Sequence, residues 1–339
     1  MRLIDLHTDW LLQYAPEATV FDAALYPRVR ARLGQSEGYL QGTWAAVLSC
    51  YRAEDDWARQ ADPWAALGQL LARVEAEFCG RLLFTAEDVG RWLDDPEGLC
   101  WGIVGVEGFD ALVRSPGDLD RLAGLFTRGV RLFQPVYAAS SVLGGSSTPG
   151  DERGLTDLGR AFLEALADLA AGPGGPCPVL DLAHLNPHAA AEALDWFEAD
   201  DRRATRLIPV YSHGAPRHEG FATPRAITPE NLRRLRALGG VVGFSVGPPF
   251  YDSAEALKAG IEAAAAVPFR GRPGFEGIAI GTDFLGVDQT LPGLGGVTGI
   301  VAWLSSSFDP VTAVALIQGN ARQLLARIFG HGSTCAGPS

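Results

Sequence analysis

Short apolar runs, rich in β-branched residues, alternate along the chain with longer stretches in which apolar residues recur at helical spacing. Runs of the first kind predict buried strands, and the longer stretches predict amphipathic helices. The predicted strands are Leu3 to His7, Thr43 to Tyr51, Gly102 to Glu107, Val130 to Tyr137, Pro178 to His184, Leu207 to His213, Val241 to Val246 and Ile278 to Phe284. The predicted helices include Trp57 to Glu77, Leu119 to Thr127, Asp157 to Ala171, Pro229 to Leu238 and Ala254 to Ala266.

Eight strands that alternate with helices favour one α/β domain, a single parallel (β/α)₈ barrel of the TIM type. A chain of 339 residues could also form two domains of about 150 residues each, and a doubly wound open sheet is the structural alternative. We expect the barrel to span residues 1–330 and residues 331–339 to form a short flexible tail.

Two longer segments interrupt the alternation, and we predict that they are insertions after the first and fourth strands. They run from Leu11 to Gly42 and from Ser140 to Gly154. Both follow the carboxyl ends of strands, the face where such barrels build their active sites. The second segment is rich in Gly and Ser, so it is either a mobile loop over the site or a solvated connector.

Composition narrows the classes of function. The chain carries 40 acidic and 28 basic residues, a formal net charge of -12, which disfavours binding to nucleic acid or to an anionic membrane surface. No apolar run approaches the ~20 residues of a membrane span. Its five cysteines are widely spaced and form no C-x-x-C pair, which is typical of a reducing compartment. We therefore expect a cytoplasmic protein with no nucleic-acid or membrane partner.

Ionisable side chains gather at the carboxyl ends of the predicted strands. They are His7 and Asp9 after the first strand, Glu107 at the third, His184 at the fifth, His213 at the sixth and Asp283 at the eighth. These ends meet in a barrel, so the carboxylates would repel one another unless one is protonated or a cation neutralises them. Imidazole and carboxylate ligands without a thiolate suit zinc or another borderline first-row ion. The number of donors fits two ions better than one, so the pattern predicts a binuclear centre.

The chain contains a single lysine, Lys258, within an alanine-rich helical stretch. Some binuclear barrel hydrolases bridge their metal ions with a carbamylated lysine, but this position is unsuited to that role. We expect a carboxylate to bridge the ions instead, and Glu107 is the candidate.

The motifs, their order and their spacing resemble the membrane (renal-type) dipeptidases of the amidohydrolase superfamily over most of the chain. The matching stretches are LIDLHTD at the start, GVEG (Gly105 to Gly108), GVRLF (Gly129 to Phe133), GLTDLGR (Gly154 to Arg160), LDLAHLN (Leu180 to Asn186), YSHGAPR (Tyr211 to Arg217), RAITPENLRRLRALGGVVG (Arg225 to Gly243), GTDFLG (Gly281 to Gly286) and QGNARQLLARIF near the end. An ordered set of this kind is far more specific than any single motif.

The resemblance implies a zinc-dependent hydrolase with two zinc ions in each chain. It assigns His7 and Asp9 to one ion, His184 and His213 to the other, and Glu107 to the bridge between them. It also implies that coordination lowers the pKa of a water molecule towards ~7, which makes that water the nucleophile. A homodimer is suggested on the same ground.

The resemblance further implies how a substrate is handled. Asp283 would accept a proton from the water and pass it to the leaving amine, acting first as general base and then as general acid. Arg225 would grip the free carboxylate of a dipeptide, which suits the fork geometry of a guanidinium. The rival interpretation of Arg225 is an exposed arginine at the start of a helix.

Three places depart from the pattern of the family. A histidine that helps to stabilise the tetrahedral intermediate is expected six residues after the GVR arginine, but counting from Arg131 places Tyr137 there. A tyrosine hydroxyl can donate a hydrogen bond to an oxyanion but offers no positive charge, and loss of one such donor costs on the order of 100- to 1000-fold in rate. Phe109-Asp110 replaces Gly-His, and Thr8 replaces Asn. We expect Tyr137 to take both a catalytic and a substrate-binding role.

These observations leave three hypotheses. The first is hydrolysis of the amide bond of a small dipeptide or a dipeptide-like amide with a free carboxylate. The second keeps the barrel and the metal centre but changes the substrate to a lactone, an N-acyl amino acid or a modified peptide adduct, because Tyr137 and Phe109-Asp110 alter the pocket. The third is a metal-stabilised binding or scaffold protein that has lost catalysis, and the intact set of metal-site residues argues against it.

Overall fold

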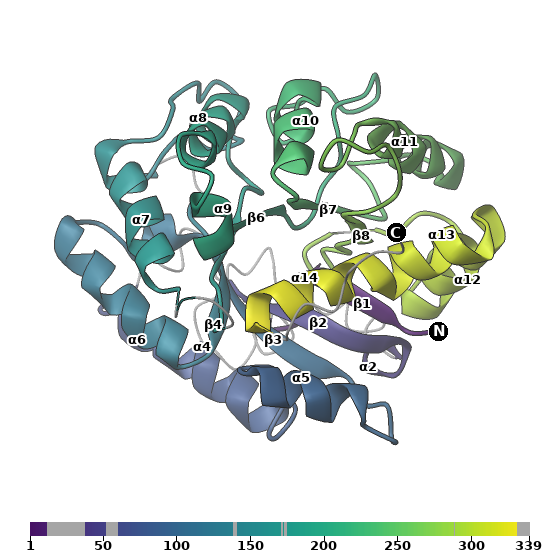
Figure 1. Ribbon diagram of the computed structural model, residues 1–339, viewed down its shortest axis with the longest axis horizontal. Coiled ribbons are helices and arrows are strands. Elements are labelled where there is room, and N and C mark those ends of the chain that lie inside the picture. The colour runs from purple at the N-terminus through teal and green to yellow at the C-terminus, as the bar shows by residue number, and fades with distance from the viewer. Residues whose placement is uncertain are drawn as a thin grey trace.

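The computed structural model describes residues 1–11, 38–51, 60–137, 141–170, 172, 175–287 and 289–330. Eight parallel strands close into a barrel in which each strand pairs with the next along the chain and β8 pairs with β1, with helices around it (Figure 1). The strands are β1 (Leu3–Thr8), β2 (Thr43–Cys50), β3 (Trp101–Glu107), β4 (Val130–Gln134), β5 (Val179–Asp181), β6 (Ile208–Tyr211), β7 (Val241–Phe244) and β8 (Ile278–Ile280). The predicted TIM-type barrel is confirmed, and the open sheet is excluded.

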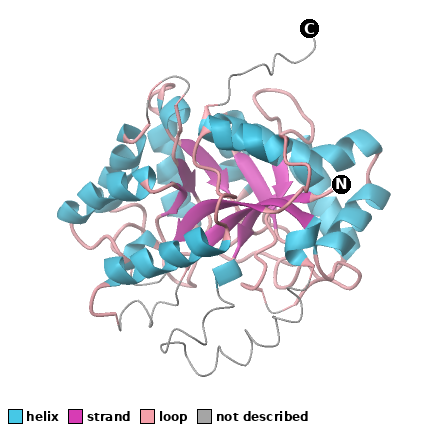
Figure 2. Ribbon diagram, turned by 90° about the horizontal axis from the view of Figure 1, so that it is seen from below, coloured by secondary structure: helices cyan, strands magenta, loops and turns pink. Residues whose placement is uncertain are grey.

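The helices lie around the strands, which occupy the middle of the molecule (Figure 2). They are α2 (Tyr39–Gly42), α4 (Pro63–Glu77), α5 (Ala86–Leu93), α6 (Leu122–Thr127), α7 (Asp157–Asp168), α8 (Pro187–Glu198), α9 (Arg203–Arg206), α10 (Pro229–Ala237), α11 (Ala254–Ala266), α12 (Val297–Ser307), α13 (Pro310–Val314) and α14 (Asn320–Phe329), with 3₁₀ helices at Phe109–Ala111 and Pro116–Arg121 and a π-helical segment at Ala315–Gly319. The helix predicted from Leu119 begins only at Leu122, because the residues before it form a 3₁₀ helix. The first turn of α4 is fixed by Asp62, whose side chain accepts a hydrogen bond from the N–H of Ala65.

Several strands end before the predicted position, and this changes where the candidate residues lie. The strands β4, β5, β6 and β8 end three, three, two and four residues early, so Tyr137, His184, His213 and Asp283 all lie in the turns that follow. Backbone pairing of β5 with β6 ends at Asp181, whose carboxylate accepts the next N–H groups in place of a backbone carbonyl. His184 and Asp283 have positive φ angles of 66° and 55°, a costly conformation that is typical of functional sites.

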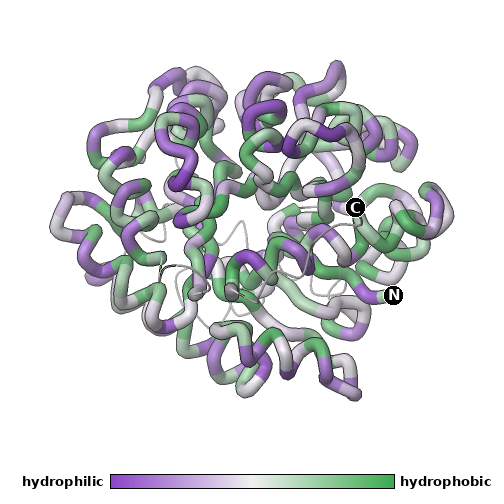
Figure 3. The backbone as a smooth tube through the Cα atoms, viewed as in Figure 1, coloured by the Kyte–Doolittle hydropathy of each residue, from purple (hydrophilic) through white to green (hydrophobic). Residues whose placement is uncertain are grey.

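Apolar side chains fill the barrel and also the space between the barrel and the helices. These side chains form two clusters, an inner one within the barrel and an outer one between the barrel and the helices. Side chains alternate between the two along β1, because Leu3 packs in the outer cluster and Ile4 in the inner cluster. Figure 3 shows hydrophobic residues concentrated in the strands at the centre, and hydrophilic residues recurring along the outer sides of the helices.

One end of the barrel is closed by α14, which crosses it in Figure 1. Leu324, Ile328 and Phe329 of this helix belong to the inner cluster. Asn320 donates hydrogen bonds to the carbonyls of Phe275 and Ile278, both 2.7 Å long, at the amino end of β8. The end of the barrel at which a site can form is therefore the one formed by the carboxyl ends of the strands.

The insertion after β4 is held in place over most of its length. The N–H of Gly145 donates to the carbonyl of Gly154 at 3.1 Å, and the N–H of Ser147 donates to the carbonyl of His184 at 2.8 Å. Asn186 donates to the carbonyl of Asp151 at 2.7 Å. These bonds tie the insertion to the turn that carries His184. The larger part of the first insertion, residues 12–37, and the predicted tail, residues 331–339, lie outside the described residues.

Candidate metal centre

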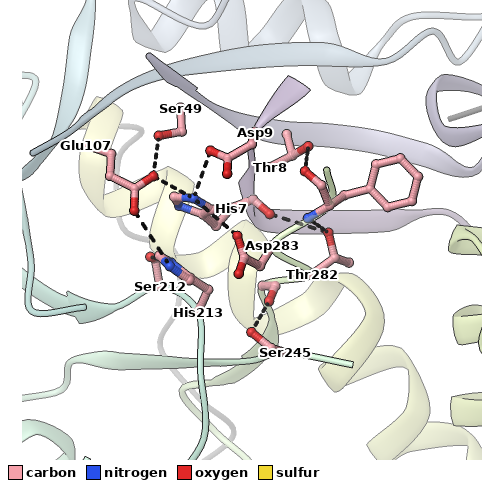
Figure 4. A network of polar contacts seen from close by, with 12 residues as sticks. His7, Thr8, Asp9, Ser49, Glu107, Ser212, His213, Ser245, Thr282 and Asp283 are labelled. Atoms are coloured by element: carbon pink, nitrogen blue, oxygen red, sulfur yellow. Dashed lines mark hydrogen bonds and ion pairs between the residues drawn. The ribbon is translucent and has the colours of Figure 1, made fainter. Parts of the chain in front are cut away.

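Glu107 ends β3 at the carboxyl mouth of the barrel and lies between the predicted ligands (Figure 4). One carboxylate oxygen, Oε2, lies 3.2 Å from Nε2 of His7. The other, Oε1, lies 3.2 Å from Nε2 of His184 and 3.9 Å from Nε2 of His213. Only 2% of Glu107 is exposed. Each oxygen thus faces a different histidine group, as a bridging ligand must.

The first group surrounds His7. Its Nε2 lies 3.6 Å from Oδ1 of Asp9 and 4.0 Å from Oδ1 of Asp283, in addition to its approach to Glu107. This nitrogen is buried and makes no hydrogen bond of acceptable geometry within the part of the chain that the structure describes. A buried polar atom without such a bond is costly. A cation among these carboxylates would remove both that cost and their mutual repulsion.

The second group consists of His184, His213 and Glu107. The two imidazole Nε2 atoms lie 3.2 Å apart. In this group, as in the set of His7, Asp9 and Glu107, the ligand atoms lie within 4.8 Å of one another. A further set within the same limit contains Asp181 with His7 and His213, but Ser212 engages that carboxylate. The donor set of neutral nitrogen and buried carboxylate fits first-row divalent ions.

Burial sets the protonation of the second group. It lowers the pKa of His184 to about 4, and the positive charge of Arg225 acts in the same direction. Burial, followed by the charges of His7 and Arg225, lowers the pKa of His213 well below its ordinary value. Both rings are therefore neutral at pH 7, which is the form that binds a metal ion.

The first group behaves differently because its carboxylates are close. Burial lowers the pKa of His7, but the carboxylates of Glu107 and Asp9 outweigh it and raise that pKa well above 6.5. Burial also raises the pKa of Glu107, but His7 and His184 bring it well below its ordinary value. At Asp283, burial and then the charge of Asp9 raise the pKa to about 8. Asp283 is thus a carboxyl group that can hold a proton near neutral pH, as acid-base chemistry requires.

A chain of hydrogen bonds fixes the ring of His213. Ser212 Oγ lies 2.8 Å from Nδ1 of His213 and donates its proton to the carboxylate of Asp181. Asp181 also accepts the backbone N–H of Ser212 at 3.0 Å and that of Ala183 at 3.1 Å. A serine hydroxyl has one proton, so Nδ1 must donate to Ser212. Nε2 is left with a free lone pair on the side of Glu107, as a metal ligand needs.

Asp5, on β1, accepts a similar set of hydrogen bonds. Its carboxylate accepts the backbone N–H of His7 at 3.2 Å and that of Thr282 at 2.8 Å. It also accepts the hydroxyl of Thr282, and that of Tyr39 at 2.8 Å. Thr282 directly precedes Asp283 (Figure 4). Asp5 therefore fixes the backbone at a predicted ligand and at the predicted proton carrier.

Sequence reasoning missed these supporting residues and two more that contact Glu107. Ser49 Oγ donates to Oε2 of Glu107 at 3.1 Å, and Nε2 of Gln134 donates to Oε1 at 3.0 Å. One signal was available, because an acidic residue within an apolar strand run must find donors when it is buried. The Asp-Leu-His and Asp-Leu-Ala-His patterns at Asp5 and Asp181 have that form.

Arg225 lies beside the second group. Its Nη2 donates to the carbonyl of His213 at 3.1 Å, and its Nη1 donates to the hydroxyl of Tyr211 at 3.0 Å. The guanidinium carbon lies 5.6 Å from the ring centre of Tyr211 and 5.7 Å from that of Phe250. Arg225 is half-buried and precedes α10, so the interpretation as an exposed arginine at a helix start is wrong.

Tyr137 also lies at the centre, and Lys258 does not. The ring of Tyr137 stacks on that of His184 with the ring centres 4.5 Å apart. Lys258 lies on α11 and pairs with Glu262 of the same helix. The structure therefore brings together all the candidate ligands, Asp283, Arg225 and Tyr137, and leaves the single lysine on the outer ring of helices.

A closed (β/α)₈ barrel with imidazole and carboxylate groups spaced for metal ligation at its carboxyl mouth has the architecture of the metal-dependent hydrolases. The model of one family matches residues 2–325: membrane dipeptidase (Peptidase family M19). The chain belongs to this family and is a hydrolase.

Individual relatives are distant in sequence. An uncharacterized protein in the pqqA 5' region of Klebsiella pneumoniae is 26% identical over 281 residues, which cover 78% of this chain and 94% of that protein. The solved structure of a metallopeptidase named dipeptidase AC has 22% identity and a TM-score of 0.68, covering 97% of this chain and 99% of that one. A metallopeptidase from Rhodobacter sphaeroides, liganded with a phosphinate mimic of the dipeptide L-Ala-D-Ala, has 21% identity and a TM-score of 0.67 over the same shares. Structures at this distance show the fold.

Among the described residues, the helices are all too short or too polar to cross a membrane.

Proposed function

We propose that this chain binds two zinc ions on either side of Glu107 and hydrolyses the amide bond of a dipeptide with a free carboxylate. The observation that carries the proposal is the position of Glu107, whose two oxygens face His7 on one side and His184 with His213 on the other. Membership of the membrane dipeptidase family supports it.

The donor set fits two such ions. His7 and Asp9 would hold one, His184 and His213 the other, and Glu107 would contact both. When bound, divalent ions lower the pKa of water and polarise a carbonyl group. The neutral state of His184 and His213 supports this assignment. The buried Nε2 of His7, which makes no hydrogen bond of acceptable geometry within the described residues, supports it as well.

Asp283 would carry the proton. Its carboxylate lies 4.0 Å from Nε2 of His7, and its raised pKa of about 8 lets it hold a proton between two steps. It would accept that proton from water and release it to the nitrogen of the leaving amine. A bound cation would favour the carboxylate form before the reaction.

Arg225 and Tyr137 would orient the substrate. The positive charge of Arg225 beside the second group would bind the free carboxylate of the dipeptide, and the hydroxyl of Tyr137 would donate to the oxygen that gains charge. The Rhodobacter sphaeroides relative was solved with a mimic of L-Ala-D-Ala, so we propose that dipeptides with a carboxyl-terminal D-residue are among the substrates.

The test is release of free amino acids from a panel of L,L- and L,D-dipeptides by the zinc-loaded protein. Asp283→Asn should lower kcat by about 100- to 10,000-fold while the zinc content is unchanged. Asp157→Asn makes the same chemical change at an exposed position on α7 and should have no effect. Absence of turnover on every dipeptide, with two zinc ions bound, would overturn the dipeptidase assignment.

A second candidate keeps the metal centre and changes the substrate to a lactone, an N-acyl amino acid or a peptide adduct. It is favoured by the stacking of Tyr137, a residue without positive charge, on His184. The same assay with lactones and N-acyl amino acids separates the two candidates. Turnover of these compounds alone, abolished by Asp283→Asn, would establish the second.

A further inference from the structure

The turn that carries His184 is bonded to the insertion after β4, which the structure describes over residues 141–154. The N–H of Ser147 donates to the carbonyl of His184 at 2.8 Å. Two residues further along the turn, the N–H of Asn186 donates to the carbonyl of Gly145 at 3.1 Å. The insertion therefore holds the backbone of this turn at two points.

Asn186 adds a side-chain tie to the same insertion. Its amide nitrogen Nδ2 donates to the carbonyl of Asp151 at 2.7 Å and to that of Arg153 at 2.9 Å. Its amide oxygen Oδ1 accepts the N–H of Ala189 at 2.8 Å and so caps the first turn of α8. Only 1% of Asn186 is exposed. This one side chain therefore joins the insertion, the turn of His184 and α8.

The contact between the insertion and Asn186 is closely packed. A Cβ at Gly145 would lie 2.2 Å from Nδ2 of Asn186 and 2.1 Å from the carbonyl oxygen of Arg153. Gly145 is buried, so the insertion would have to move away from Asn186 to accommodate that atom. Where the insertion ends, Glu192 of α8 accepts the N–H of Leu155 at 3.0 Å. The insertion thus packs against the turn before α8 and is bonded to α8 itself.

The backbone of His184 needs this support. Its φ angle of 66° is costly for a residue with a Cβ and persists only when the surrounding structure holds it. The residue also lies beyond the last backbone pairing of β5 with β6. None of the described residues donates to or accepts from its Nδ1, whereas Ser212 bonds to Nδ1 of His213. Beyond its ring contacts with Tyr137 and His213, the placement of its Nε2 therefore depends on the backbone that the insertion holds.

We infer that Asn186 is a positioning residue for His184, and that docking of the insertion and binding of a metal ion at the second group stabilise each other. Coupling of this kind is reciprocal. If the docked insertion raises metal affinity by some factor, the metal ion must favour the docked insertion by the same factor. The inference rests on the proposed function, which assigns a zinc ion to His184 and His213. It gives this segment a role that its Gly- and Ser-rich composition does not predict.

Asn186→Asp tests the tie while it keeps the helix cap. A carboxylate caps a helix as well as an amide does, but it cannot donate, so both side-chain bonds to the insertion are lost. We expect the ion held by His184 and His213 to bind about tenfold more weakly, with the affinity for the other ion unchanged. Stepwise competition for the two zinc ions with a chelator measures both affinities.

Asn320→Asp is the matched control. Asn320 also donates two hydrogen bonds to backbone carbonyls, both 2.7 Å long, but at the closed end of the barrel. This variant should unfold at a lower urea concentration, as Asn186→Asp should, because each loses two buried hydrogen bonds. Its affinity for either zinc ion should not change. An equal loss of zinc affinity in both variants would overturn the inference, because the loss would then follow from stability alone.

Gly145→Ala disrupts the same contact from the other side and adds no charge. It should weaken binding of the same zinc ion, whereas Gly124→Ala, at an open position on α6, should weaken neither. Because Asn186→Asp and Gly145→Ala disrupt one contact, the double variant should lose about as much affinity as the more affected single variant. Losses that add in full, or unchanged affinity in both single variants, would overturn the inference and leave the proposed function intact.

Hydrogen exchange tests the reciprocal effect without turnover. The N–H groups of Ser147 and Asn186 both lie in the contact. Zinc loading of the wild-type protein should slow their exchange about tenfold, and it should slow exchange less in Asn186→Asp. Exchange that is equal with and without zinc, in protein that binds two zinc ions, would overturn the inference alone. Wild-type protein that binds no zinc would overturn the proposed function, and the inference with it.

Discussion

Asp5 and Asp181 lie in β1 and β5, on opposite sides of the closed barrel, and each supports one half of the candidate metal centre. Each buried carboxylate accepts an N–H from its own segment, and both the N–H and the hydroxyl of a residue that follows the neighbouring strand. That residue is Thr282 for Asp5 and Ser212 for Asp181.

The two sets end on different groups. The Asp181 set ends on the ring of His213, because Ser212 lies between the carboxylate and Nδ1. The Asp5 set ends on the backbone N–H groups of His7 and Thr282 and on the hydroxyl of Tyr39. Asp181 therefore controls which nitrogen of His213, a candidate ligand, carries the proton. Asp5 instead fixes the backbone at His7, a candidate ligand, and at Thr282, which precedes Asp283. Loss of the buried carboxylate should therefore lower metal affinity in the half that contains Asp181, and should lower the free energy of unfolding in the half that contains Asp5.

The largest effect should come from Glu107, where the two halves meet. Glu107→Gln replaces one charged oxygen by an amide nitrogen that cannot bind a cation, so the two proposed ions would lose their common ligand. We expect zinc content to fall below two ions per chain and kcat to fall by at least about 1000-fold, because metal activation is worth several kcal/mol. Zinc analysis beside kinetics checks this. Ser49→Ala, which removes only one hydrogen bond to Glu107, should cost far less, and equal losses would contradict a bridging role.

Asp181→Asn and Asp5→Asn compare the halves directly. An amide at residue 181 would donate to Ser212, which reverses the chain of hydrogen bonds and moves the proton of His213 to Nε2. We expect zinc affinity to fall about 10- to 100-fold. Asp5→Asn should instead lower the free energy of unfolding by about 1–3 kcal/mol with a smaller change in zinc affinity. Competition with a chelator and urea unfolding measure the two quantities, and the reverse pattern would show that the halves are not distinguished in this way.

After removal of the metal, the free energy of unfolding should depend on pH through Asp283, which lies in the group around His7. With a folded pKa of about 8 and an unfolded value near ~3.9, Asp283 keeps its proton only in the folded state between pH 5 and 8. The free energy of unfolding of the metal-free protein should therefore fall as pH rises, by up to about 1.4 kcal/mol per pH unit from this group. Urea unfolding at several pH values checks this. Asp283→Asn should reduce the slope, and a slope that is identical in the variant would refute the assignment.

The smallest effects should come from the hydroxyl residues. Ser212→Ala removes the acceptor of Nδ1 and should weaken zinc binding about tenfold. Thr282→Val removes a hydroxyl that donates to Asp5 and should cost about 1 kcal/mol of stability with little change in affinity. Ser245→Ala is the control. Ser245 is buried directly after β7, and within the described residues its hydroxyl donates only to the carbonyl of Gly281, at 3.1 Å. An equal loss of zinc affinity in all three variants would mean that each substitution loosens the surrounding structure in general, and would contradict the distinct role of Ser212.

The number and order of the strands could be predicted because each strand is buried on both faces and forms an apolar run. The ends of the strands could not. Apolar residues continue past Asp181 and through Leu182 and Ala183, so the pattern gives no sign that a side chain replaces the backbone in the pairing. Sequence alone likewise gave no sign that Pro116–Arg121 forms a 3₁₀ helix before α6.

The clustering of the candidate ligands could be predicted because a barrel brings the carboxyl ends of its strands together. The supporting residues could not, because their roles depend on partners far along the chain. Asp5 contacts Thr282, which lies 277 residues away. Asn186 contacts the carbonyl of Asp151, 35 residues earlier, only because the insertion after β4 returns to the turn after β5. Spacing indicates which residues share an end of the barrel, and the structure alone gives which atoms meet.

The most direct measurement is anomalous diffraction at the zinc edge from crystals of the zinc-loaded protein. We expect two peaks, one beside His7 and Asp9 and one beside His184 and His213, with Glu107 in contact with both. A single peak, or a peak coordinated by Asp181 in place of Glu107, would contradict a binuclear centre bridged by Glu107.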